Sequence, residues 1–280
     1  MRWCTLVSSP GFRDKVEMRK AAKTGLDKKY DDNGYVIVRN AIDPGLAQEM
    51  VAHVHWLCKR HPDVRPEALH HDLLVNDPFI HRLVGDERLL DGAEQFIGMD
   101  IALFAAHYIA KKPFDGQAVG WHQDGSYWPL VPMQVTTLWV AGTDSTVETG
   151  CMRVIPGTQD HRLLTRTDMI EMNSENYVLP LAIHPDEIDD SEAIDIELKA
   201  GDVSIHNPMI IHGSNANKSD KWRVGLTLRY IPTTTYVEQE HHENILLRGN
   251  ASRAIKNIYA ERPVFVGGEH MPFRGHELYK

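Results

Sequence analysis

The 280-residue chain has a formal net charge of −9, with 42% hydrophobic and 25% charged residues. This composition is typical of a soluble globular protein, and the length suits one large β-barrel domain. The negative charge argues against nucleic acid and anionic membrane as partners, because both attract basic surfaces. It does not restrict a small-molecule substrate, since a buried pocket can carry its own local charge.

The cysteines and the N-terminus indicate an intracellular protein. Cys4, Cys58 and Cys151 are widely spaced and include no Cys-x-x-Cys pair, which favours reduced thiols over a disulfide framework. The first 20 residues are too polar for a secretory signal, and no stretch approaches the length of a membrane span. We therefore expect a cytoplasmic protein without a membrane partner, whose oligomeric state the sequence leaves open.

The first part of the chain has mainly helical patterns. A helix is expected around residues 13–30, followed by a strand at Tyr35–Val38. Asp43 and the proline after it are a favourable helix start, and the apolar periodicity continues over residues 44–61. Another amphipathic helix is expected over residues 86–97, where a glycine follows the last apolar position.

After residue 100 the pattern changes to short runs rich in β-branched and aromatic residues, separated by Gly, Pro, Asn and Asp. Such runs are typical of an antiparallel sandwich or barrel. They are Ile101–Ala110, Val135–Ala141, Cys151–Ile155, Ile194–Leu198, Asp202–Ile205, Met209–His212 and Val224–Ile231. The sequence thus predicts a mainly β, double-layered barrel with α-helices packed on its outside.

The domain organisation follows from these patterns. We expect a single domain over residues 1–280, with a mainly helical part (1–100), a barrel core (101–232) and a C-terminal tail (233–280). The less regular stretch 162–190 is a candidate lid, because long insertions between barrel strands often cover a site. A short helix is expected in the tail near residues 251–259.

A histidine and an aspartate two residues apart, His122 and Asp124, are the first candidate site residues. In a strand, this spacing places both side chains on one face, where both can bind one metal ion. The pattern His-x-Asp is common by chance, and the alternative is a surface pair on a turn. Adjacent histidines at His70-His71 and His241-His242 have polar surroundings, which favour solvated surface.

A third ligand is expected at His206 or His212, which lie around a strand–turn–strand segment. His212 is preferred because Arg223 follows it, on a strand that carries Gly225 and Arg229 on the same side. A buried arginine needs an anionic partner, and its planar guanidinium suits a ligand carboxylate. The alternative is a structural ion pair with one of the 39 acidic residues.

Two histidines and one carboxylate form the facial triad of non-haem Fe(II) oxygenases. Zinc accepts the same ligands with water in the fourth position. An arginine placed for a dicarboxylate favours iron with 2-oxoglutarate over zinc and hydrolysis.

The ordered motifs of the chain resemble the phytanoyl-CoA dioxygenase (PhyH) family of Fe(II)/2-oxoglutarate-dependent oxygenases. The motifs are His122-Gln123-Asp124, Gly150-Cys151, Val154–Gly157, Gly201-Asp202, His212–Ser214 and Arg223, within a resemblance from about Tyr35 to Pro232. The resemblance implies a double-stranded β-helix, or jelly roll, with flanking helices. It implies iron bound by His122, Asp124 and His212, and the distal carboxylate of 2-oxoglutarate bound by Arg223 and Ser214. The further cosubstrate positions that it implies are Tyr108, Trp139 and Gln123.

The implied reaction is the oxidation of a small organic molecule by O2, usually a hydroxylation, with release of succinate and CO2. Because Asp124 is present, hydroxylation is favoured over halogenation, in which related enzymes replace this carboxylate. Tyr127, Trp128 and Arg153 are the candidate substrate residues, and each has a structural alternative as a core aromatic or an ion pair. The rival functions are a zinc-type hydrolase or isomerase on the same barrel and a non-catalytic ligand-binding jelly roll.

Overall fold

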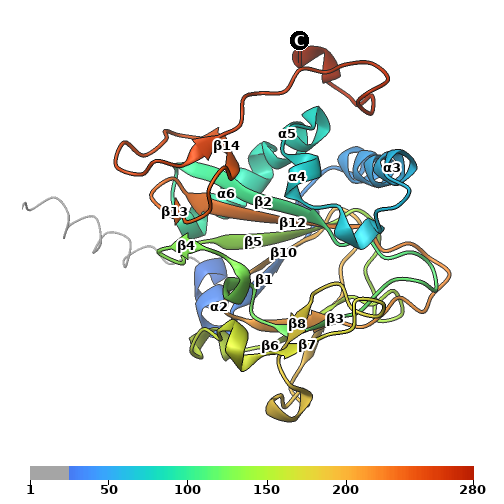
Figure 1. Cartoon of the computed structure of the whole chain (residues 1–280), viewed down its shortest axis with the longest axis vertical. Helices are drawn as coiled ribbons and strands as arrows, with labels where there is room; N and C mark the ends of the chain where they lie inside the picture. The colour runs from blue at the N-terminus through green and yellow to red at the C-terminus, as the bar shows by residue number, and fades with distance from the viewer. Residues whose placement is uncertain (1–24) are drawn as a thin grey trace, which may run out of the picture.

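The computed structural model describes residues 25–280, which form two facing β-sheets with helices against the outer face of the larger sheet (Figure 1). The predicted fold class, a mainly β jelly roll with flanking helices, is confirmed. The part of the predicted helix 13–30 that precedes residue 25 lies outside the described residues. Among residues 25–280, no helix combines the length and the apolar character that a membrane crossing requires.

The larger sheet has seven strands in the order β1-β10-β5-β12-β2-β14-β15. Their bounds are Tyr35–Val38 for β1, Val203–His206 for β10, Thr136–Ala141 for β5, Gly225–Pro232 for β12, Ile101–Tyr108 for β2, Glu243–Arg248 for β14 and Ile258–Tyr259 for β15. All neighbours are antiparallel except β14 and β15, which are parallel. Strand β12 lies at the centre and pairs with β2 on one side and β5 on the other.

The smaller sheet has four strands in the order β3-β11-β6-β9. They span Val119–His122 (β3), Ile211–Ser214 (β11), Met152–Ile155 (β6) and Ile194–Ile196 (β9). Two further strand pairs are β4 (Leu130–Val131) with β13 (Tyr236–Val237), and β7 (Ile170–Glu171) with β8 (Leu181–Ala182). In Figure 1, β3, β6, β7 and β8 lie below the large sheet and α3, α4 and α5 lie above it.

Five α-helices, all before residue 100, are described: α2 (Gly25–Asn33), α3 (Pro44–Arg60), α4 (His71–Leu74), α5 (Pro78–Val84) and α6 (Glu87–Ile97). Aspartates cap three of them: the side chains of Asp43, Asp77 and Asp86 accept hydrogen bonds from first-turn N–H groups of α3, α5 and α6. Such capping satisfies donors that a helix start leaves free. The predictions for α3 and α6 are confirmed, whereas the short α4 and α5 were not predicted.

Single 3₁₀ turns complete the set of elements. They are η1 (Pro66–Ala68), η2 (Asp124–Tyr127), η3 (Thr158–Asp160), η4 (Arg166–Asp168), η5 (Pro185–Glu187) and η6 (His276–Leu278).

The two faces of the large sheet differ in character. On β12, Leu226, Leu228 and Tyr230 belong to the main hydrophobic core, which includes the buried faces of the helices. Thr227 and Arg229 point the opposite way and line a pocket that also contains residues of the small sheet. Because side chains alternate along a strand, the same strand supplies the apolar core and the polar interior between the sheets.

The tail differs from its prediction. The helix expected near residues 251–259 is wrong, because this stretch consists of bends followed by strand β15. Strand β14 was also missed: charged residues occupy both of its ends, and its position near the sheet edge leaves half of it only partly buried. Strands β14 and β15 therefore extend the large sheet beyond the predicted core.

The insertion at residues 162–190 contains the small β7–β8 hairpin, which lies beside β3 of the small sheet. The backbone N–H of Ile183 donates to the carbonyl of Trp121 at 2.8 Å. Leu179 from this insertion lines the pocket between the sheets. Its role as a lid stays a prediction.

Candidate metal and cosubstrate site

Two histidines of the small sheet and one aspartate converge at the inner face of the barrel. His122 on β3 and His212 on β11 are direct cross-strand partners, and their rings are 4.2 Å apart between centroids. Asp124 Oδ1 lies 3.3 Å from His122 Nε2 and 3.8 Å from His212 Nε2. One ligand atom from each residue lies within 4.8 Å of the other two, which is a spacing that a single metal ion can bridge.

Asp124 reaches this position from a turn rather than from the strand that was predicted. Strand β3 ends at His122, and Asp124 begins the 3₁₀ turn η2. The turn is held by a hydrogen bond from Gly125 N to Pro208 O at 2.8 Å, so it is tied to the segment that leads into β11. Thr137 Oγ1 donates to Asp124 Oδ2 at 3.4 Å. The prediction placed Asp124 beside His122 through strand alternation, whereas the structure brings the two side chains together through a turn.

Backbone carbonyls fix the orientation of both imidazoles. His122 Nδ1 donates to Gly120 O at 2.9 Å, and His212 Nδ1 donates to Ile210 O at 3.0 Å. A carbonyl oxygen only accepts, so Nδ1 carries the hydrogen and Nε2 keeps a free lone pair. This is the arrangement that metal-binding histidines use, and the donor set therefore fits a metal ion.

The electrostatics of the three residues suit a metal as well. Burial raises the pKa of Asp124, but the neighbouring His122 and His206 outweigh that effect and leave the pKa well below its usual value. Burial, with the nearby His122, lowers the pKa of His212 to about 3. The aspartate is thus ionised and His212 neutral near pH 7, as metal coordination requires.

His206, the other candidate for the third ligand, lies on β10 across the barrel. Its Nε2 is 3.7 Å from Asp124 Oδ2, and its ring centroid is 5.0 Å from that of His212. Both ring nitrogens are buried without a hydrogen-bond partner. Among residues 25–280, the group with mutually close ligand atoms consists of His122, Asp124 and His212, without His206.

Arg223 lies at one end of the same pocket, just before β12. It is fully buried, and its guanidinium donates to the carbonyls of Gly150 and Ile109. It also lies over the Trp139 indole, with 5.2 Å from the guanidinium carbon to the ring centroid. Burial lowers its pKa to about 10, so it remains charged at pH 7. No carboxylate of the described chain forms an ion pair with it, which removes the structural ion pair as an explanation.

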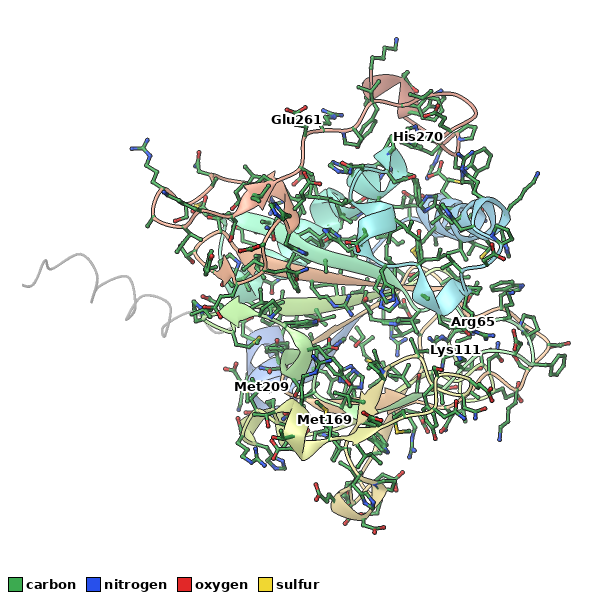
Figure 2. The ribbon with its side chains drawn as sticks, in the orientation of Figure 1. Arg65, Lys111, Met169, Met209, Glu261 and His270 are labelled. Carbon is green, nitrogen blue, oxygen red and sulfur yellow. The ribbon has the colours of Figure 1, made fainter. Side chains whose placement is uncertain are left out.

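Lys111 is a component of this end that was not predicted. It is fully buried, and its Nζ donates to Ser214 Oγ at 2.8 Å and to Asn215 O at 2.5 Å. Burial and the nearby Arg223 drive its pKa well below the usual value. In Figure 2, Lys111 and Arg65 are labelled on the right-hand side of the molecule and Met209 on the left. The alternation of side chains along β2 could have indicated its inward position, because Lys111 lies an even number of residues after the inward-facing His107.

The structure brings some of the predicted cosubstrate residues to the site and not others. Trp139 and Ser214 line the pocket together with the three metal-site residues and Arg223. Tyr108 points to the helix layer, where its hydroxyl lies 3.0 Å from His53 Nδ1. Gln123 is buried beside the pocket, and its side chain donates to Met209 O and accepts from Leu164 N. Tyr108 and Gln123 do not line the pocket. Each directly follows an inward-facing histidine, His107 or His122, and adjacent side chains in an extended chain point to opposite faces.

The three substrate candidates have separate surroundings. The hydroxyl of Tyr127 donates to Leu181 O at 2.7 Å, and its ring meets His122 edge-on at 5.9 Å. Trp128 lies against the guanidinium of Arg229, with 5.3 Å from the guanidinium carbon to the ring centroid. Arg153 pairs with Asp190 and Asp195 at 3.1 and 3.3 Å, which is the structural ion pair that the sequence left open.

The histidine pairs expected at the surface are not all exposed. His71 is buried and stacks on His242 with 5.2 Å between ring centroids. His107 is also buried, lines the pocket and bonds through Nε2 to the carbonyl of Glu67 at 2.7 Å. The surface prediction is therefore wrong for His71, because helix α4 packs directly on β2.

The metal-site residues, Arg223 and Ser214 all line one pocket between the sheets. It has about 510 Å³ of empty space, a volume that includes space open to solvent. Its lining comprises His107, Ile109, Val119, His122, Asp124, Trp139, Met152, Leu179, His206, His212, Gly213, Ser214, Arg223, Thr227 and Arg229.

Comparisons with known proteins agree with this geometry. A phytanoyl-CoA dioxygenase domain-containing protein 1 homolog of Dictyostelium discoideum is 31% identical over 131 residues, which are 46% of each chain. The aligned part is about half the length of the first curated relatives that the chain matches.

Solved structures show the same fold. The non-heme monooxygenase ThoJ, in its apo form, has a TM-score of 0.71 and 23% identity, covering 85% of this chain and 88% of ThoJ. The epimerase SnoN, in complex with Fe3+, alpha ketoglutarate and nogalamycin RO, has a TM-score of 0.62 and 22% identity, covering 90% of this chain and 97% of SnoN.

The family itself follows from the sequence match. The profile of the family described as phytanoyl-CoA dioxygenase (PhyH) matches residues 30–225, which include the metal-site residues and Arg223. The chain belongs to the phytanoyl-CoA dioxygenase family of Fe(II)/2-oxoglutarate-dependent oxygenases.

Proposed function

We propose that the chain is a non-haem Fe(II)/2-oxoglutarate-dependent dioxygenase that oxidises a small organic molecule, most simply by hydroxylation, and releases succinate and CO2. One observation carries the proposal: a two-histidine, one-carboxylate site faces the same pocket as a buried arginine that has no carboxylate partner among the described residues. A metal site alone is compatible with many reactions. The additional buried cation, Arg223, favours an anionic cosubstrate beside the metal.

His122, Asp124 and His212 would hold the iron, with both imidazoles presented through Nε2. Bound Fe(II) with 2-oxoglutarate would supply O2 activation and the oxidation of an unactivated C–H bond. The protein contributes fixed ligands: each histidine is oriented by a carbonyl two residues earlier on its own chain segment. Asp124 fills the third protein position, which favours hydroxylation over halogenation.

Arg223 and Ser214 would bind the distal carboxylate of 2-oxoglutarate. The guanidinium of Arg223 is kept in place by two backbone carbonyls and the Trp139 indole, so little conformational entropy is lost on binding. Lys111 donates to Ser214 Oγ, which leaves the Ser214 hydroxyl hydrogen free to donate to a carboxylate. Trp139 closes this end of the pocket and excludes water from the charged contact.

An anaerobic titration of the purified protein with Fe(II) and then 2-oxoglutarate tests the proposal. The parent should bind one Fe(II) and then one 2-oxoglutarate. Arg223→Met should keep iron binding but weaken 2-oxoglutarate binding by on the order of a hundredfold, because charge-assisted bonds are lost. Arg253→Met, at an exposed position in the C-terminal part of the chain, is the matched control and should bind both like the parent.

The same titration separates the proposal from its rivals. His212→Ala should lose tight Fe(II) binding, whereas His206→Ala should retain it; the reverse result would move the third ligand to His206. A parent protein that binds zinc but no 2-oxoglutarate would favour the hydrolase or isomerase. A folded parent that binds neither metal nor 2-oxoglutarate would leave the non-catalytic jelly roll.

A further inference from the structure

Arg229 is a second arginine in the pocket, and it has no role in the proposed binding of iron and 2-oxoglutarate. It lies on the inner face of β12 and lines the pocket together with Asp124 and the two iron-site histidines. Its Nε atom is buried without a hydrogen-bond partner. Within residues 25–280, its guanidinium forms no ion pair, and its ring contact is with Trp128, 5.3 Å from the guanidinium carbon to the centroid.

This arginine differs from those that have carboxylate partners. Arg39, Arg153 and Arg248 each pair with one or more carboxylates at the surface. Arg223 has no carboxylate among the described residues but donates to two carbonyls. Arg229 is partly buried, and withdrawing even part of a guanidinium from water without such compensation is costly. An anionic group of the substrate would offset this cost.

The two pocket arginines have different neighbours across the barrel. They are six residues apart, which corresponds to roughly 20 Å of extended chain, with Arg223 just before β12 and Arg229 within it. Arg229 is the cross-strand partner of Thr137, and Thr137 Oγ1 donates to Asp124. Arg223 instead contacts Trp139, the next inward residue of β5. An anion at Arg229 would therefore lie on the Asp124 side of the site, away from the distal carboxylate of 2-oxoglutarate.

The charges of the pocket favour a monoanion. Its lining contains one carboxylate, Asp124, and two guanidinium groups, Arg223 and Arg229, and these three groups sum to a formal charge of +1. Fe(II) and the dianion of 2-oxoglutarate cancel each other, so the +1 remains after both have bound. An organic monoanion would neutralise it.

We infer that Arg229 binds a carboxylate of the organic substrate, so that the compound oxidised is a small organic acid. This inference rests on the proposed function and specifies its substrate class. The planar guanidinium matches a carboxylate with two parallel hydrogen bonds, and Trp128 on its face leaves the edge available. A phosphomonoester dianion would leave the enclosed site with an excess negative charge.

Binding of matched probes to the anaerobic Fe(II)·2-oxoglutarate protein tests the inference. The probes are short aliphatic and phenyl-substituted monocarboxylic acids, each paired with its primary carboxamide and with a phosphomonoester of similar size. Ligand-observed NMR measures their affinities. The acids that bind the parent should bind about tenfold to a hundredfold more tightly than their amides, because the amide loses the charge-assisted contact.

Variants at Arg229 test whether this residue causes the preference for acids over amides. Arg229→Met should bind Fe(II) and 2-oxoglutarate like the parent but lose the preference for acids, whereas Arg229→Lys should retain part of it. Arg253→Met again serves as the matched control. Because the acid–amide comparison is made first in the parent, the test stands even if one variant folds poorly.

Several results would overturn the inference. These are a parent that binds amides or phosphomonoesters as well as acids, and an Arg229→Met protein that keeps the acid preference. Weakened 2-oxoglutarate binding in Arg229→Met would assign Arg229 to the cosubstrate instead. A parent that does not bind 2-oxoglutarate at all would be a failure of the proposed function, which the earlier titration detects separately.

Discussion

At the scale of single residues, the site depends on small parts of the backbone. His122 and His212 each donate from Nδ1 to the carbonyl two residues earlier, so a local interaction fixes which nitrogen faces the metal position. Gly225 has a comparable role at the other end of the pocket. A Cβ atom at this position would overlap the Trp139 indole, the ring against which Arg223 lies.

Gly225→Ala should therefore weaken 2-oxoglutarate binding and destabilise the protein. The added methyl group displaces Trp139 and with it Arg223, and overpacking of this kind costs about 1–3 kcal/mol. Anaerobic 2-oxoglutarate titration and urea unfolding measure the two effects. Gly267→Ala is the control, because no atom lies within 4 Å of the position that its methyl group would take. Unchanged 2-oxoglutarate affinity in Gly225→Ala would show that Trp139 does not position Arg223.

At the scale of elements, His71 joins helix α4 to two strands of the large sheet. Its Nε2 donates to the carbonyl of Glu243 on β14 at 2.8 Å, and its Nδ1 accepts from Ala106 N on β2 at 3.3 Å. Both nitrogens are used in the neutral form, and burial lowers the pKa of His71 to about 4. A proton on Nδ1 would face the N–H of Ala106 and break that bond.

This arrangement predicts acid sensitivity. Since the pKa in the unfolded chain is about 6.5, the unfolded state binds a proton that the folded state does not between about pH 6.5 and 4. The contribution of neutral His71 is complete above this window and is lost as the pH falls through it. Between neutral pH and about pH 5, the parent should lose about 2 kcal/mol more stability than His71→Gln. Urea unfolding at both pH values measures this difference, and equal losses would contradict the assignment.

At the scale of the whole molecule, the C-terminal segment closes the outer side of the helix layer. Met271, Phe273 and Tyr279 belong to the same core as the helices, and Phe273 packs edge-on against Phe79 of α5. Arg274 bonds to Glu49 on α3. In Figure 1 this segment passes over α5 toward the C-terminus. The tail thus stabilises the side of the molecule that is opposite to the metal site.

Phe273→Ala should destabilise the protein by about 3–5 kcal/mol, because it leaves a cavity in a buried aromatic cluster. Iron and 2-oxoglutarate stoichiometry of the folded protein should not change, since the large sheet separates the cavity from the pocket. Calorimetry and metal titration measure both. Phe114→Ala, at a position that is 72% exposed, should change stability by less than about 0.5 kcal/mol. A lost metal site in folded Phe273→Ala would show coupling through the sheet.

The sequence by itself determined the class of the protein, because its signals are local. Capping aspartates and apolar periodicity identified α3 and α6, and short β-branched runs identified the central strands. His122, Asp124, His212, Arg223 and Ser214 were singled out by motif, and the structure brings them to one pocket. Whether they bind iron and 2-oxoglutarate is the subject of the proposed titrations.

Only the tertiary structure decided which of the other polar residues share that pocket. Tyr108 and Gln123 lie one residue from inward-facing positions, and a shift by one residue turns a side chain to the opposite face. Asp124 reaches the site through a turn held by a distant carbonyl, which no local pattern encodes. Arg229 was visible as an inward position, but its lack of a partner among the described residues depends on every neighbour across the barrel. Strand β14 was missed for a similar reason, since its pairing with β2 outweighs its polar composition.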